Sequence, residues 1–287
     1  MDKFHTSILV DEVVEALHVK RGSWYVDATL GGGGHTEAIV RAGGKVLGID
    51  VDRDAIGHAT ERLQGIDGIV LRQRSYSELE LILKEEGIGN VEGVVFDLGV
   101  SSHQFDTPER GFSYRFSDAP LDMRFGDDKK ETASELLSRV SEEELYEIIA
   151  TYGEEECARS IAHALVSARK IKKFERVRDL NNALESILGG GHEHFRMLSR
   201  VYQALRMAVN DEMKTLQEGL IGAEQSLSSG GVLMALTFHS IEDRIVKRFL
   251  RTHTFSRVTK KPKHPSQEEY LNNSRSRSVK MRVGKKL

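Results

Sequence analysis

A run of four glycines between an apolar stretch and a helix-like stretch is the feature that most constrains the fold of this chain. Residues 25–40 read YVDATLGGGGHTEAIV, with the glycines at positions 31–34. Glycine loses more conformational freedom on folding than other residues, so a run of it is used where the backbone turns sharply or approaches another group closely. The sequence therefore predicts a strand, a tight loop and a helix. The backbone of the loop is expected to lie close to another group, either a ligand or another part of the chain.

Strand and helix patterns alternate through the first hundred residues. Apolar strand-like runs are predicted at 24–30, 45–52, 69–76 and 91–102, and amphipathic helical runs at 35–43, 53–63 and 77–87. This alternation is typical of a doubly wound α/β fold, in which helices cover both faces of a parallel sheet. Reactive groups in such folds gather at the carboxyl ends of the strands.

The alternation stops after residue 104 and resumes near residue 206. The intervening residues show helical patterns without a clear strand, and a long helix is predicted over 200–227, a buried strand over 230–238 and a helix over 240–251. We therefore predict a domain formed by 1–104 and 206–287, interrupted by a mainly helical substrate-recognition domain at 105–205.

Composition excludes several classes of protein. With 287 residues, 39% hydrophobic and 30% charged, the chain is long enough for a substantial core, and no window approaches the 18 apolar residues of a membrane span. Cys157 is the single cysteine, which excludes an internal disulfide and a cysteine-rich zinc site. The sequence predicts a cytoplasmic protein without a metal site, and it leaves the oligomeric state open.

Positive charge is concentrated at the carboxyl end of the chain. Residues 244–287 contain 14 Lys and Arg against two Glu, a net charge of +12, whereas residues 1–243 carry −15. A basic C-terminal arm on an acidic body favours a nucleic-acid partner, although a solvated tail would give the same count.

The glycine loop and the acids around it favour one nucleotide cofactor over another. Asp50 closes the second predicted strand 19 residues after Gly31, the position of an acid that binds ribose hydroxyls. A dinucleotide site would need a third glycine where Thr36 stands. Asp27 instead completes a DxxxGxG pattern, and no Lys or Arg lies between Asp27 and Val40. The pattern is typical of an S-adenosylmethionine (SAM) methyltransferase, and an NAD-dependent oxidoreductase is the weaker alternative.

Two residues that follow predicted strands are candidates for catalysis. Asp97 ends the apolar run VVFD, where methyltransferases that act on amino groups place an acceptor for the target amine, but such an Asp also caps turns. His239 follows the strand at 230–238. Ser240 and Asp243 match a helix capping box, which leaves His239 unexplained and makes it a candidate base or orienting group.

Arg and aromatic side chains alternate in the segment ERGFSYRFSDAPLDMRF, residues 109–125. Such a mixture suits stacking on unpaired bases and contact with phosphates, and it equally suits one buried face of an irregular loop. A second set of polar residues shares one helical face within 200–210. The sequence RSRS at 275–278 is a candidate phosphate contact. The predicted substrate-binding residues are Arg110, Phe112, Arg124, Arg206, Asn210, Arg275 and Arg277.

Motifs in the same order along the chain carry a family resemblance. They are VDATLGGGGHT, GIDVDRDAI, DLGVSSHQFD, RGFSY, PLDMRF, YGEE, YQALRMAVNDE, FHSIEDRIVK and NNSRSRSVKMRV. Together they resemble the bacterial ribosomal RNA small-subunit methyltransferase H family, also called MraW. The resemblance implies a SAM-dependent enzyme that methylates the exocyclic N4 amine of one cytidine in the ribosomal decoding region, on the assembled small subunit.

The resemblance also implies which residues contact the cofactor. Added to Gly31 from the loop pattern, they are Gly33, Gly34, His35, Asp50, Tyr76, Asp97 and Gln104. The family usually has Phe where Tyr76 stands, so this chain keeps a ring and adds a hydroxyl. A non-catalytic RNA-binding or ribosome-assembly factor remains the alternative from a different functional class, since it would also use the basic C-terminal segment.

Overall fold

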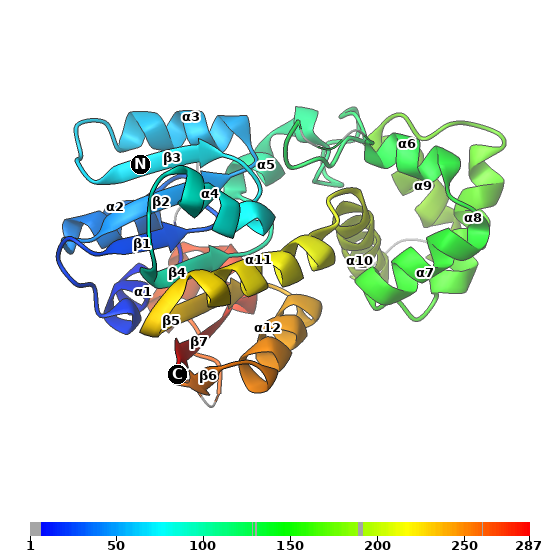
Figure 1. The fold of residues 1–287 in the computed structure, drawn as a ribbon. Coiled ribbons are helices and arrows are strands. Elements are labelled where there is room, and N and C mark those ends of the chain that lie inside the picture. Colours follow the sequence, from blue (N-terminus) through cyan, green and yellow to red (C-terminus); the bar gives the residue numbers. More distant parts are fainter. Residues whose placement is uncertain (1–6, 128, 130, 189–191, 260) are drawn as a thin grey trace. The chain divides into compact units, whose positions relative to one another are not determined.

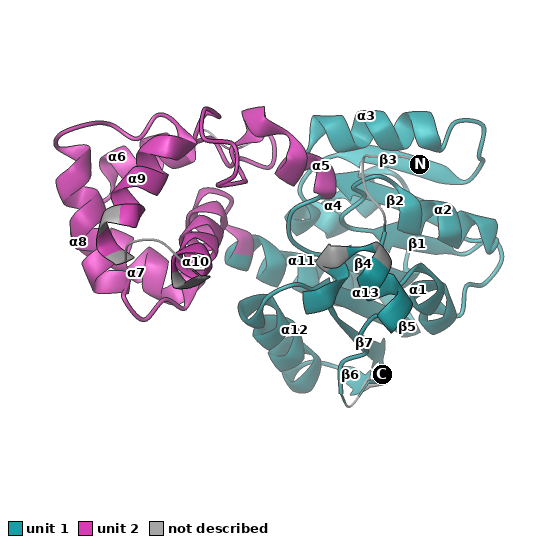
Figure 2. Ribbon diagram, turned by 180° about the vertical axis from the view of Figure 1, so that it is seen from behind, with its two compact units in different colours: residues 1–101, 213–287 teal, residues 102–212 magenta. Residues whose placement is uncertain are grey.

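The chain forms two compact units in a computed structural model that describes residues 7–127, 129, 131–188, 192–259 and 261–287 (Figure 1). The first unit comprises the chain up to residue 101 together with 213–287, and the second comprises Ser102–Glu212 (Figure 2). Sequence patterns placed the inserted domain at 105–205. Within the described ranges no helix is both long and apolar enough to cross a bilayer.

The first unit contains a seven-stranded sheet in the order β3-β2-β1-β4-β5-β7-β6. Neighbouring strands from β3 to β5 pair in parallel, whereas β7 is antiparallel to β5 and β6. The strands are β1 (Trp24–Asp27), β2 (Lys45–Asp50), β3 (Ile69–Gln73), β4 (Val91–Asp97), β5 (Leu227–Thr237), β6 (Phe255–Arg257) and β7 (Lys280–Lys286).

Helices cover both faces of this sheet. They are α1 (Val10–Leu17), α2 (Gly34–Arg41), α3 (Arg53–Arg62), η1 (Tyr76–Glu78), α4 (Leu79–Glu85), α11 (Glu212–Ser226), α12 (Ser240–Thr252), α13 (Gln267–Asn272) and η3 (Ser274–Ser278). In β4 the side chains alternate, so Val94 and Phe96 join the core under α4, α11 and α12, while Val95 joins the core under α1 and α2. The predicted doubly wound α/β fold is confirmed.

The second unit is helical. Its elements are α5 (Ser102–Asp106), η2 (Pro108–Arg110), α6 (Ala133–Arg139), α7 (Glu142–Gly153), α8 (Ala158–Arg169), α9 (Val177–Leu188) and α10 (His192–Val209). Capping boxes begin two of the helices, with Thr132 and Glu135 at α6 and Ser141 and Glu144 at α7. Helix α7 packs against α8 and α10, which closes the core of this unit.

The long helix predicted over 200–227 is wrong, because the chain forms two helices there. Helix α10 ends at Val209 and α11 begins at Glu212. Asp211 lies between them in the left-handed region with a φ of 51°. Asn and Asp adopt this conformation more readily than other side-chain-bearing residues, so the sequence ND permits a break that helical periodicity does not show.

The predicted basic C-terminal arm is also wrong, since its last part lies inside the sheet. Strand β7 pairs on one side with β5 and on the other with β6. Met281 and Val283 are fully buried, and Arg282 between them is 8% exposed. The alternation of apolar residues with an Arg that finds a buried partner makes this segment a strand in spite of its charge.

Candidate functional site

The glycine loop has two backbone positions that favour glycine. Gly31 and Gly33 have φ values of 48° and 76°, and Gly33 is the N-cap of α2. A Cβ at Gly33 would lie 3.2 Å from Leu63 Cδ1 and 3.3 Å from Ala59 Cβ. A Cβ at Gly34 would lie 2.1 Å from Ser7 Oγ, so that glycine allows the N-terminal segment to pack against the loop. The run thus combines a left-handed turn with a close chain contact.

Asp50 holds the loop from the end of β2. Its Oδ2 accepts a hydrogen bond from Gly31 N at 2.8 Å, and its Oδ1 accepts one from Asp52 N at 2.9 Å. Burial raises the pKa of Asp50 to about 6, and the two backbone hydrogen bonds offset only part of this effect. Asp50 is partly exposed and retains acceptor capacity for hydroxyl groups.

A buried polar cluster lies beneath the loop. Asp27, at the end of β1, accepts a hydrogen bond from Thr36 Oγ1 at 2.8 Å. Its Oδ1 is buried and accepts no hydrogen bond from the described residues, and burial raises the pKa of this carboxyl. Ring atom Nε2 of His35 lies 2.9 Å from Ile8 O, which means that Nε2 carries a proton. Sequence reasoning did not commit to Asp27 or Thr36, although both lie in the DATLGGGGHT motif.

Asp97 ends β4 in the middle of the sheet, between β1 and β5. Its backbone N–H donates to Thr29 Oγ1 at 2.6 Å, and its Oδ2 lies 3.9 Å from His35 Nδ1. The side chain is 8% exposed. The structure therefore brings Asp97, His35 and the glycine loop together at the carboxyl edge of the sheet, as sequence topology predicted.

Tyr76 lies in η1, at the same edge of the first unit. Its ring contacts Phe96 edge-on with centroids 5.4 Å apart. A Cβ at Gly219 of α11 would lie 2.5 Å from Tyr76 Cδ2, so the helix packs directly on this ring. Its predicted packing against adenine stays a prediction.

His239 caps the helix that follows it, a role that the sequence analysis assigned to Ser240 and Asp243. It is the N-cap of α12 and forms the capping box with Glu242, in place of Ser240 and Asp243. Glu242 N approaches His239 Nδ1 at 3.5 Å, and His239 Nε2 lies 3.1 Å from Glu242 Oε1. This cap accounts for His239 without a part in the reaction, and its predicted role as a base or orienting group stays a prediction. Asp97 stays the first candidate for the proton acceptor.

Gln104 belongs to α5 of the second unit, and its side chain is 6% exposed. Its predicted contact with the cofactor rests on the resemblance and stays a prediction.

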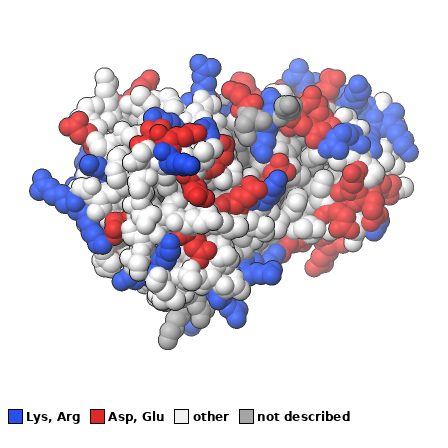
Figure 3. Space-filling model, in the orientation of Figure 1, with Lys and Arg blue, Asp and Glu red and all other residues white. Residues whose placement is uncertain are grey.

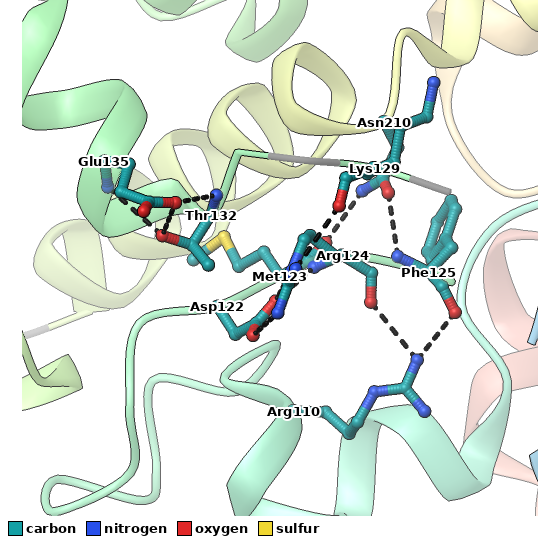
Figure 4. A network of polar contacts seen from close by, with 9 residues as sticks. All are labelled: Arg110, Asp122, Met123, Arg124, Phe125, Lys129, Thr132, Glu135 and Asn210. Carbon is teal, nitrogen blue, oxygen red and sulfur yellow. Dashed lines mark hydrogen bonds and ion pairs between the residues drawn. The ribbon is translucent and has the colours of Figure 1, made fainter. Parts of the chain in front are cut away.

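The predicted RNA-binding residues of the second unit form a network of internal contacts (Figure 4). One Arg110 nitrogen donates to the carbonyl oxygens of Arg124 and Phe125, and the Arg124 guanidinium forms two hydrogen bonds with Asp122. Asn210 is 3% exposed, accepts from Phe125 N at 2.8 Å and donates to Met123 O at 2.7 Å. This network holds Met123 at a φ of 65°.

Burial limits which of these residues can meet RNA. Phe112 is 5% exposed and stacks on Phe125, and Arg206 forms two hydrogen bonds with Glu212. Asn210, one of the polar residues of the predicted helical face, is buried just after the end of α10, and Phe112 belongs to the buried face of its loop. Their predicted contact with RNA stays a prediction. Arg277 in η3 is exposed, and Arg275 is in the same element with a side chain outside the described residues.

The groups around the loop fit SAM. The side chains that meet there are the carboxyls of Asp27, Asp50 and Asp97, which suit a sulfonium and an ammonium cation. Arg62 reaches the loop, but its guanidinium donates to Gly32 O and Glu37 Oε2. A sheet of this order, parallel except for β7, with a glycine loop after β1 and acids ending β2 and β4, defines a Rossmann-like class I methyltransferase.

Comparison with known proteins identifies the family. The model of the MraW methylase family matches residues 2–287. Proteins named ribosomal RNA small subunit methyltransferase H are 38% identical in Carboxydothermus hydrogenoformans and 42% identical in Coprothermobacter proteolyticus. The matches cover 100% and 98% of this chain, and 99% and 96% of those proteins. The chain belongs to the MraW methylase family, as the motifs indicated, and SAM is the cofactor of this family.

A solved rRNA methylase structure from Streptococcus thermophilus is also similar to this chain. It has a TM-score of 0.45 and 13% sequence identity, and the match covers 97% of this chain and 93% of that one.

The loop geometry predicts different outcomes for the same substitution at two glycines. Gly33→Ala forces a left-handed φ on a residue with a Cβ, at a cost of about 1–2 kcal/mol, and crowds Leu63. We expect SAM affinity to fall about tenfold or more by calorimetry. Gly57→Ala in α3 is the matched control, since nothing lies within 4 Å of its Cβ and Ala favours the helix. Unchanged SAM affinity in Gly33→Ala would exclude this loop as the binding site.

The raised pKa of Asp50 predicts a pH dependence for cofactor binding. A hydroxyl donates more strongly to a carboxylate than to a carboxylic acid, so SAM should bind more weakly as Asp50 becomes protonated below about pH 6. Calorimetric titrations of SAM between pH 5 and pH 8 measure this change. Asp50→Asn should bind SAM weakly across the range and remove the transition near pH 6. A transition that persists in this variant would assign the pH dependence to another group.

Proposed function

We propose that this protein transfers a methyl group from SAM to the exocyclic N4 amine of a specific cytidine in the decoding region of small-subunit ribosomal RNA. The observation that carries the proposal is the match of residues 2–287 to the MraW methylase model, with relatives named for the small-subunit RNA at 38–42% identity. The assembled small subunit is the proposed substrate, which implies a cytoplasmic location.

The residues at the sheet edge have distinct tasks in this reaction. When bound, SAM supplies an electrophilic methyl group on a sulfonium. Asp50 and the loop from Gly31 to Gly34 hold the nucleoside part, and Asp97 provides negative charge near the cation. The N4 lone pair of cytosine is delocalised into the ring, so the amine must be oriented and its protons accepted as charge develops. Asp97 is the acid positioned for this task, at the end of the central strand β4.

Positive charge is unevenly placed, which bears on how RNA is held. Figure 3 shows Asp and Glu gathered over α7, whose first turn contains Glu142, Glu143 and Glu144. Exposed cations of the C-terminal segment include Lys247, Arg248 and Arg251 on α12, and Arg277 in η3. We propose that phosphates contact the basic surfaces and avoid α7, and that the bases of splayed nucleotides are held by aromatic side chains.

Methyl transfer from labelled SAM to purified small subunits tests the proposal. Subunits from cells that lack this protein should accept label at one cytidine in the decoding region, located by mass spectrometry of nuclease fragments. Subunits from cells that contain the protein should accept little, because the site is already modified. Label at another base, or at an oxygen, would refute the proposed specificity. Binding without transfer by the SAM-loaded protein would favour the assembly-factor alternative.

Phosphate contact by Arg277 predicts a change in salt dependence. The logarithm of the affinity for small subunits should fall linearly with the logarithm of salt concentration. Arg277→Gln should weaken binding and reduce the slope by about one, because one phosphate is no longer neutralised. Arg159→Gln is the control, since that exposed Arg pairs with Glu143 of the acidic α7. Equal slopes for wild type and Arg277→Gln would show that Arg277 does not contact a phosphate.

A further inference from the structure

The second unit contains a surface pocket that none of the predicted site residues lines. Its volume is about 490 Å³, within the range of small-molecule sites, and its lining residues are Tyr114, Phe195, Arg196, Ser199 and Arg200. Four of these belong to one face of α10, and Tyr114 comes from the loop after η2. Phe195 is 55% exposed, which is unusual for a large aromatic residue on a helix.

Buried residues of the second unit support the aromatic side of the pocket. Tyr114 contacts Phe195 with centroids 6.2 Å apart and Tyr202 with centroids 5.8 Å apart. Tyr202 is 4% exposed and donates its hydroxyl to Asn181 Oδ1, and Asn181 Nδ2 donates to Tyr114 O. Burial raises the pKa of Tyr202, so it stays a neutral donor. The backbone of Tyr114 is thus hydrogen bonded to Asn181, and its ring packs edge-on against the buried ring of Tyr202.

The charged side of the pocket is positive and partly anchored. One Arg200 nitrogen lies 3.3 Å from Glu155 Oε2, and Glu155 is in turn held by Cys157 N at 3.1 Å from its Oε1. Arg200 remains 46% exposed on its side chain, and Arg196 is exposed one turn earlier on α10. Two guanidinium groups beside two rings match a ligand that has both an aromatic face and anionic groups.

We propose that this pocket binds an unpaired nucleotide of the ribosomal RNA. The base stacks on Phe195 and Tyr114, and Arg196 and Arg200 contact the flanking phosphates. This inference rests on the proposed function for its choice of RNA as ligand. The pocket would help to select a region of RNA with an extruded base.

Binding of a labelled single-stranded RNA hexanucleotide and of a duplex of the same strand tests the pocket directly. Phe195→Ala should weaken hexanucleotide binding about 5- to 150-fold by fluorescence anisotropy, because one stacked base is lost, and should leave duplex binding within about twofold. Phe195→Tyr should retain near wild-type binding. The control is Leu81→Ala in α4 of the first unit, which truncates another exposed apolar residue. It should change neither hexanucleotide binding nor duplex binding.

Other outcomes of these experiments overturn the inference. Wild-type binding by Phe195→Ala, or an equal loss for hexanucleotide and duplex, would show that the pocket does not stack a base. A change in sedimentation of Phe195→Ala would assign the pocket to a contact with a second copy of the chain. Photo-crosslinking of 4-thiouridine RNA should label Tyr114 or Phe195, and labels confined elsewhere would refute the site. Methyl transfer by the wild type is measured separately, so failure of the proposed function would appear there and leave the binding comparison intact.

Discussion

Replacing Asp97 with Ala should lower the rate constant of methyl transfer about 10²- to 10⁴-fold, the range for loss of a positioned proton acceptor. The reason is the position of Asp97 at the carboxyl end of the central strand β4, beside the glycine loop. Its side chain is 8% exposed, and its Oδ2 lies 3.9 Å from His35 Nδ1. Asp97→Asn keeps an acceptor oxygen without the charge and should fall between the wild type and Ala. Single-turnover transfer to small subunits at saturating SAM measures the rate constant.

The matched control for Asp97 is an acid at the opposite end of the same strand. Glu92 lies near the start of β4 and pairs with Lys20, whose side chain is 66% exposed. A solvent-exposed pair of this kind contributes little, so Glu92→Ala should leave the transfer rate and SAM affinity unchanged. Calorimetry with SAM separates the two roles predicted for Asp97. A normal rate together with normal SAM affinity in Asp97→Ala would remove it from both.

Features that depend on nearby residues were predictable from the sequence. The strand, glycine loop and helix at 24–41 follow from apolar periodicity and from glycine, and Asp50 lies at the end of β2 where the spacing from Gly31 placed it. Gly31 N and Asp50 Oδ2 are in fact hydrogen bonded. Helix starts at α6 and α7 follow from Thr-x-x-Glu and Ser-x-x-Glu patterns, because the partners in a capping box are three residues apart.

Features that depend on distant partners were not predictable. Asn210 appears as a polar position on a helix face, yet its amide binds the backbone of Met123, 87 residues away in the chain. Arg282 counts as one more charge in a basic tail, yet it lies inside the sheet with Asp243, 39 residues away. The sequence alone does not show whether a charged or amide side chain is hydrogen bonded to water or to another buried group.

The capping error at α12 has the same origin. His-x-x-Glu at 239–242 and Ser-x-x-Asp at 240–243 both satisfy the local spacing, one residue apart. Asp243 is committed to Arg282 of β7, and Glu242 Oε2 accepts from Phe238 N at 2.8 Å. A contact between α12 and β7 therefore fixes which residue of the FHSIEDR motif caps the helix. This long-range contact also predicts where the first unit is most sensitive to mutation.

Arg282→Met should strongly lower the thermal stability of the first unit. Arg282 Nε and one terminal nitrogen lie 2.6 and 3.0 Å from the two Asp243 oxygens, and both residues are 8% exposed. The substitution leaves buried Asp243 with only Lys280, 3.7 Å away, as an ion-pair partner, and loss of one partner of a buried pair costs about 3–5 kcal/mol. At about 2–4 °C per kcal/mol for a protein of this size, the melting temperature should fall by roughly 6–20 °C. Thermal unfolding followed by circular dichroism measures the shift, and Arg251→Met, at an exposed position of α12, is the control.

The pH dependence of that loss distinguishes an ion pair from simple packing. Burial alone would raise the pKa of Asp243, but the hydrogen bonds and charge of Arg282, with the charges of Lys280 and Lys247, lower it below its ordinary value of 3.8. A lowered carboxyl pKa contributes stability above the unfolded value of about 3.8, and that contribution is lost as the pH falls through the folded value. The difference between wild type and Arg282→Met should therefore be largest near pH 7 and shrink below pH 4. Arg282→Met combined with Asp243→Leu should recover much of the loss, because no buried charge remains. A loss that is constant with pH and is not recovered in the double variant would show that Arg282 acts through its packing alone.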